Sequence, residues 1–127
     1  MIDLSPESFR ALGYQAVDLI VERLSALPAL PVRQQVPAGT RDLLMHSDIP
    51  NEGTDPAQLL NLLAELVLPY PMGNSSGRFF AWVNSPPAPM GILAEFLAAA
   101  PEPSVAGGDP AATYVEHGVL NWMKAIF

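Results

Sequence analysis

The chain is 127 residues long, carries a formal net charge of -7 and contains no cysteine. This length allows one domain and excludes two independent ones. The 50% hydrophobic content indicates a chain that buries apolar surface. The acidic balance disfavours nucleic acid as a partner, because such a partner requires a surface that neutralises phosphates. Without cysteine there is no disulfide framework or thiolate site, so we expect a cytoplasmic protein.

The sequence also disfavours export and membrane association. Asp3 and Glu7 lie where a secretory signal carries positive charge. The longest apolar stretch, residues 59–68, contains Glu65 and stops at Pro69, short of the roughly 20 residues that a membrane span requires. We therefore expect neither a signal peptide nor a membrane partner.

The first strong structural signal is a helix start at Ser5-Pro6-Glu7. These residues supply a hydroxyl cap, a proline at the first helical position and an acid suited to the positive end of the helix dipole. Apolar residues then recur at spacings of three and four, which predicts a helix over 6–27 that ends at Pro28. Further prolines at 31 and 37 predict an extended connector, or strap, across another surface.

A second helix is predicted over 56–67. Residues 40–44 are consistent with a single helical turn. The stronger signal is Asp55-Pro56-Ala57-Gln58, which forms a capping box with proline at its first position. Leucines of the second helix cover more than one face, which predicts burial between two partners.

The remaining chain predicts a loop, a strand-like run and two more helices. Residues 70–78 have loop composition, and the aromatic and β-branched run 79–83 has strand propensity. A third helix is expected over 90–100, followed by a Pro/Gly-rich loop. The fourth helix has Asp109 as its expected cap and no closing glycine or polar tail, which is typical of a chain that continues further.

The sequence shows little sign of a catalytic constellation. No GxSxG, HExxH or Walker motif is present. The turn at 73–77 is favoured as a flexible loop over an anion nest, and His46 and His117 are favoured as ordinary histidines over metal ligands. The only lysine, Lys124, is expected to stay in water rather than form a Schiff base. We expect no catalytic, cofactor-binding or metal-ligating residue in this chain.

A family resemblance covers the whole chain. Residues 78–97 (RFFAWVNSPPAPMGILAEFL) resemble the N-terminal part of the pyridoxal-phosphate-dependent group II amino-acid decarboxylases, which include the aromatic amino-acid, tyrosine, histidine and glutamate decarboxylases. Residues 9–20 and 31–39 are similar to that family's opening helix and proline strap. Residues 109–122 are similar to its S-P-A-x-T-E-x-E…D-W segment.

This resemblance implies an all-α chain that opens a fold type I subunit. Residues 1–87 would form a helical dimerisation arm and residues 88–127 the first helices of the large domain. The implied assembly is an intertwined homodimer acting on a small amino acid. Trp82, Val83, Asn84 and Ser85 would line the substrate pocket, while Val105 and Ala106 would reach toward the partner subunit's site.

The resemblance implies a carboxy-lyase whose pyridoxal phosphate (PLP) is held by residues that this chain lacks. We expect the chain to supply dimer contacts and one wall of the substrate pocket and to be inactive alone. Two alternatives stay open: a stand-alone helical oligomerisation module derived from that arm, and an enzyme completed by a companion chain. For Phe79 and Phe80, ordinary core packing is as well supported as a role in the pocket.

Overall fold

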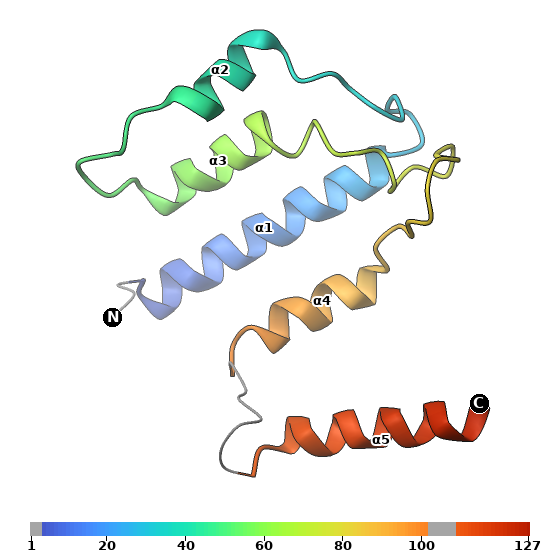
Figure 1. Ribbon diagram of the computed structural model, residues 1–127. Coiled ribbons are helices and arrows are strands. Elements are labelled where there is room, and N and C mark those ends of the chain that lie inside the picture. Colours follow the sequence, from blue (N-terminus) through green and yellow to red (C-terminus); the bar gives the residue numbers. More distant parts are fainter. Residues whose placement is uncertain (1–3, 102–108) are drawn as a thin grey trace. The chain divides into compact units, whose positions relative to one another are not determined.

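The computed structural model describes residues 4–101 and 109–127. These residues form five helices and no strand, so the all-α expectation is confirmed for them (Figure 1). They divide into two units, Met1–Pro86 and Pro87–Phe127, which are described separately. The helices are, in chain order, α1 (Pro6–Ala26), α2 (Ala38–His46), α3 (Pro56–Leu66), α4 (Pro89–Ala98) and α5 (Ala111–Ile126).

Helices α1 and α3 begin where their caps predict. The Ser5 side chain accepts a hydrogen bond from the Ser8 amide at 3.1 Å, and Asp55 accepts one from the Gln58 amide at the same distance. Each cap is followed by a proline at the first helical position, where a missing N–H costs nothing. Local sequence chemistry therefore determines both starts.

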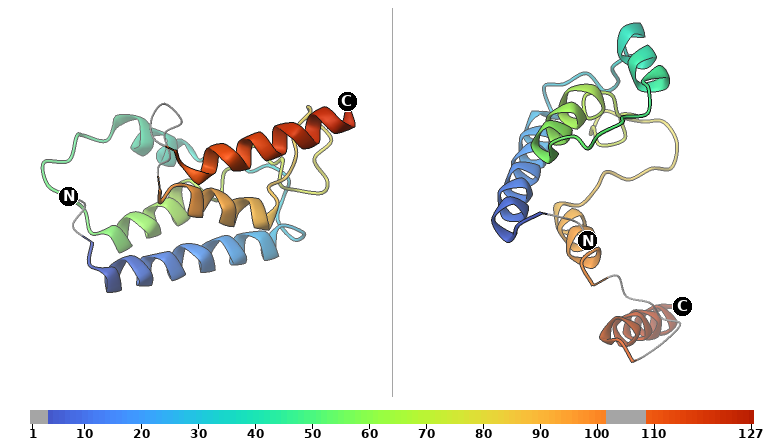
Figure 2. Two further views of the ribbon diagram at one scale, coloured as in Figure 1. Left: turned by 90° about the horizontal axis from the view of Figure 1, so that it is seen from below. Right: turned by 90° about the vertical axis from the view of Figure 1, so that its left-hand side faces the viewer.

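The first unit is built on the α1–α3 pair. The two helices lie side by side and run in roughly the same direction (Figures 1 and 2). Helix α2, which lies between them in the sequence, runs in the opposite direction (Figure 1). The Gln15 side-chain amide donates to Asn61 Oδ1 at 3.2 Å, which joins the middle of α1 to the middle of α3. Residues 27–37 connect α1 to α2; we call this connector the strap.

Helix α2 is longer than the single turn expected at 40–44. It begins after Pro37, whose φ of -57° and ψ of 147° suit a helix N-cap, and whose carbonyl accepts from the Arg41 amide at 3.0 Å. No proline follows until Pro50, and Leu43, Leu44 and Met45 all have high helix propensity. This run without a helix breaker allows more than the single turn that was expected.

The strand expected at 79–83 is absent: these residues form a coil and a bend. A strand needs a neighbouring strand to accept its backbone hydrogen bonds, and none exists among the described residues. Trp82 also has a φ of 60°, which interrupts any extended run. The prediction was wrong because β-propensity reflects how well a side chain packs in a sheet, and the described residues form no sheet.

In the second unit α4 begins at Pro89 and α5 at Ala111, with Pro110 at the N-cap of α5. Asp109 is therefore not the cap of α5, contrary to expectation. Its carboxylate instead accepts a hydrogen bond from the Tyr114 hydroxyl, one turn into the helix. This side-chain partner replaces the backbone amide that a capping aspartate would bind.

No hydrophobic residue is buried among those described. Leucines 59, 62 and 63 of α3 are each between 39% and 51% exposed, although α1 lies alongside. The described chain thus leaves apolar helix faces open to solvent. None of its described helices is long and apolar enough to cross a membrane.

Candidate functional site

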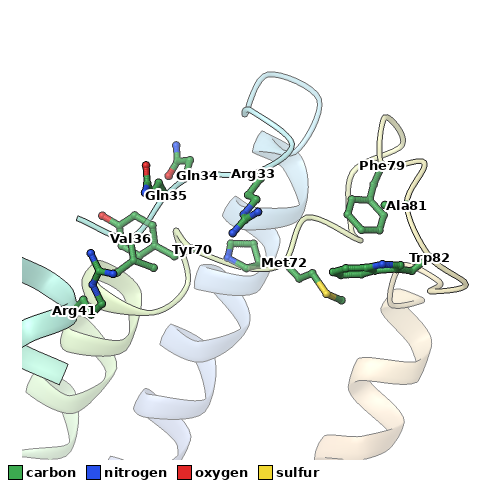
Figure 3. Close-up of a pocket in the computed structure, with 11 residues that line it drawn as sticks. Arg33, Gln34, Gln35, Val36, Arg41, Tyr70, Met72, Phe79, Ala81 and Trp82 are labelled. Carbon is green, nitrogen blue, oxygen red and sulfur yellow. The ribbon is translucent and has the colours of Figure 1, made fainter. Parts of the chain in front are cut away.

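The first unit contains an open cavity of about 620 Å³ between the strap and the segment that follows α3 (Figure 3). Its volume lies in the range of small-molecule sites. The strap and the start of α2 supply one side, and residues after α3 supply the other. The lining residues are Arg33, Gln34, Gln35, Val36, Arg41, Tyr70, Pro71, Met72, Phe79, Ala81 and Trp82.

Trp82 forms one end of this cavity. Its indole lies beside Met72 in Figure 3 and meets the Phe79 ring edge to face, with ring centroids 6.2 Å apart and an interplanar angle of 67°. This geometry is favourable for aromatic pairs. The side chain is still 74% exposed, so the indole is free to contact a ligand or another chain.

The positive φ of Trp82 is a specific feature of this end of the cavity. A φ of 60° is rare for a non-glycine residue and costs energy unless surrounding contacts hold it. Such conformations concentrate at binding sites, which agrees with the position of Trp82 on the cavity wall.

Of the four residues expected in the substrate pocket, the structure places only Trp82 in the cavity lining. Val83 is fully exposed. Asn84 donates from its side-chain amide toward Met72 Sδ at 4.0 Å, and the Ser85 carbonyl accepts from the Asn74 side chain at 3.2 Å. The pocket role of these three residues stays a prediction. Val105 and Ala106 lie outside the described residues.

The part of the cavity away from Trp82 carries positive charge. Arg33 and Arg41 supply guanidinium groups, Gln34 and Gln35 supply amides, and no acidic residue is among the lining residues. Figure 3 places Arg33 between the Tyr70 side and the Met72–Trp82 side. The arrangement suits a ligand with an anionic group and an apolar body. Sequence reasoning missed both arginines, although two of the chain's six basic residues within nine positions were a usable signal.

The other candidate groups show ordinary local structure. The 73–77 segment forms two consecutive turns, with the Ser76 amide donating to Gly73 O and the Phe79 amide to Ser76 O, both at 3.0 Å. His46 Nδ1 lies 3.2 Å from the Asp42 carbonyl, one turn earlier in α2. No group of three or more potential metal ligands occurs within residues 4–101 and 109–127.

Two curated relatives match almost the whole chain. It is 33% identical to an aromatic-L-amino-acid decarboxylase of Bacillus atrophaeus over 98% of its length. It is 32% identical to a tyrosine decarboxylase of Oryza sativa subsp. japonica over 94% of its length. The chain therefore resembles a segment of these amino-acid decarboxylases. No family model and no solved structure matches it.

The decarboxylase-like segment spans about a quarter of each relative, 26% of the first and 23% of the second. Its single lysine, Lys124, lies exposed in the last turn of α5, where the helix dipole favours a solvated cation. A lysine that forms a Schiff base is usually buried, whereas Lys124 is exposed. The described residues therefore do not fit a covalent anchor for PLP.

Proposed function

We propose that these 127 residues are the opening part of a PLP-dependent amino-acid decarboxylase, contributing dimer contacts and one wall of its substrate pocket. The observation that carries the proposal is similarity to two amino-acid decarboxylases over 98% and 94% of the chain. In this proposal residues 1–87 are the dimerisation arm and residues 88–127 begin the large domain of a fold type I subunit.

The chemistry of the reaction belongs to parts of the enzyme outside these 127 residues. PLP supplies the electron sink that stabilises the negative charge left on the substrate when carbon dioxide departs. The exposed position of Lys124 supports a division of labour in which PLP is anchored elsewhere in the enzyme. The segment alone would then neither hold PLP covalently nor release carbon dioxide.

Trp82 is the residue that best supports the pocket role. It lines a cavity of about 620 Å³, presents a largely exposed indole, and has the strained backbone typical of binding sites. We propose that the amino-acid side chain contacts this indole, with Val83, Asn84 and Ser85 completing the wall. Val105 and Ala106 would reach the pocket of the partner subunit.

The open apolar faces support the dimer role. The exposed leucines of α3 and the exposed Val115, Val119 and Trp122 of α5 leave unfavourable hydrocarbon in water. An intertwined second copy of the enzyme would cover such faces, because obligate interfaces are large and apolar.

A chimera tests the proposal. The matching quarter of the Bacillus atrophaeus decarboxylase is replaced by this chain, and native mass, PLP content and carbon dioxide release are measured. We expect a dimer that decarboxylates an aromatic amino acid, and we expect Trp82→Ala to reduce kcat/KM. Tyr14→Ala, which removes an exposed aromatic ring outside the cavity, is the matched control and should change kcat/KM little.

The outcomes separate the two roles. A chimera that dimerises and holds PLP but responds equally to Trp82→Ala and Tyr14→Ala contradicts the pocket role. A chimera that fails to assemble, while the 127-residue chain dimerises by itself, favours the stand-alone oligomerisation module instead.

A further inference from the structure

Residues 72–85, which carry Trp82, form a closed loop that we call the pocket loop. Its two ends are joined by side-chain amides: Asn74 donates to the Ser85 carbonyl at 3.2 Å, and Asn84 lies 4.0 Å from Met72 Sδ. The first contact is an ordinary hydrogen bond and the second is weak, because a thioether is a poor acceptor. These contacts close the loop but do not attach it to the rest of the unit.

Arg78 makes that attachment. Its Nη2 donates to the carbonyls of Leu30 and Pro28, the latter at 3.5 Å, which lie 48 and 50 residues earlier in the strap. Both carbonyls lie in the first residues of the strap, just beyond the end of α1 at Ala26. A charged donor on two such acceptors is stronger than a neutral hydrogen bond.

A second contact lies beside the first. Gly73 has a φ of 104°, and a Cβ at this position would collide with the Val32 carbonyl, so the loop backbone rests directly on the strap. Next to Arg78 is an open cavity of about 400 Å³, lined by Leu24, Leu27, Pro28 and residues 75–78. The loop therefore leaves open space beside the end of α1, and it is held on the strap by the Arg78 hydrogen bonds and by the Gly73–Val32 contact.

We propose that Arg78 is a positioning residue for the candidate pocket. It fixes the pocket loop on the strap, and the loop then holds the indole of Trp82 on the cavity wall. Phe79 directly follows Arg78 and forms the edge-to-face contact with Trp82. Phe79 therefore links the Arg78 anchor to the indole of Trp82. The positive φ of Trp82 persists because the loop is held on both sides, by Arg78 and by Asn74.

This inference rests on the proposed pocket function only for its consequence, the orientation of a substrate. The test of the anchor itself is a measurement on the 127-residue chain. The chain has two tryptophans, so labelling with 5-fluorotryptophan gives two fluorine resonances, which Trp122→Phe assigns. Trp122 lies in the second unit and serves as an internal reference. Far-UV circular dichroism reports the helices independently.

Three variants define the outcome. Arg78→Met keeps an unbranched side chain but removes the donors, and should shift the Trp82 resonance at least halfway to that of free 5-fluorotryptophan. Arg78→Lys restores a charged donor and should recover most of the wild-type shift. Arg10→Met, on the exposed surface of α1, is the matched control and should leave both resonances in place.

Two results would overturn the inference. One is a Trp82 resonance that does not move in Arg78→Met, or that Arg78→Lys does not restore. The other is a shift of Trp82 accompanied by an equal shift of Trp122 or by loss of helical circular dichroism, because Arg78 would then support general stability. Neither result bears on the chimera experiment, which tests the decarboxylase role separately.

Discussion

At the scale of single residues, Gly73 has little room for a side chain. Its φ of 104° is unfavourable for any residue with a Cβ, and the Val32 carbonyl occupies the space that a Cβ needs. We predict that Gly73→Ala lowers the free energy of unfolding by about 1–3 kcal/mol, measured by urea denaturation followed by helical circular dichroism. Gly77→Ala is the matched control, since nothing lies within 4 Å of its added Cβ. Equal midpoints for the two variants would contradict the prediction.

Tyr114 gives a pH-dependent prediction. The hydrogen bond to Asp109, with a smaller contribution from desolvation, raises the pKa of the Tyr114 phenol above its ordinary value of 10.0. The neutral phenol donates to the carboxylate, whereas a phenolate would be repelled by it. The contribution of this pair to stability is therefore present below pH 10 and is lost as the pH rises through the raised pKa.

The measurement is the tyrosinate absorbance in a Tyr14→Phe, Tyr70→Phe background, which leaves Tyr114 as the only tyrosine. Asp109→Ala should move the titration down toward the ordinary value. Asp48→Ala, which removes an exposed carboxylate from the first unit, should leave the titration unchanged. If the titration of Tyr114 is the same with and without Asp109→Ala, the hydrogen bond does not form in solution.

At the scale of elements, the start of α3 depends on one side chain. Asp55 accepts from the Gln58 amide at 3.1 Å and is followed by Pro56. We predict that Asp55→Ala destabilises the helix by about 1 kcal/mol, seen as reduced helical circular dichroism at a fixed urea concentration. Asp55→Asn keeps an equivalent cap and should behave like the wild type. If the two variants lose the same amount of helix, charge rather than capping stabilises the start.

Local chemistry also explains which elements were predictable. The starts at Pro6 and Pro56 follow from side chains within three residues, so the sequence alone predicts them. Asp109 was a wrong prediction because Tyr114, five residues away, competes for its carboxylate. The strand at 79–83 was wrong because a strand depends on a partner that no local pattern reveals.

At the scale of the whole molecule, the chain has no buried hydrophobic residue among those described, so its stability should depend on association. We predict that its thermal midpoint rises with protein concentration, because association covers exposed apolar faces and stabilises by mass action. Leu59→Glu, at a site 51% exposed on α3, should weaken this dependence. Gln58→Glu adds the same charge at the adjacent exposed position and is the control. A midpoint that is independent of concentration would contradict an associating chain.

The sequence by itself determined the helical class, the capped starts of α1 and α3, the proline strap and the likeness to decarboxylases, because these depend on residues close together in the chain. Only the tertiary structure brought Arg33 of the strap and Arg41 of α2 to the same cavity as Trp82, which lies some forty or more positions later in the chain. It alone also joined Arg78 to the carbonyls that follow α1. A carbonyl has no side-chain signature in a sequence, and a cavity exists only where separate segments meet.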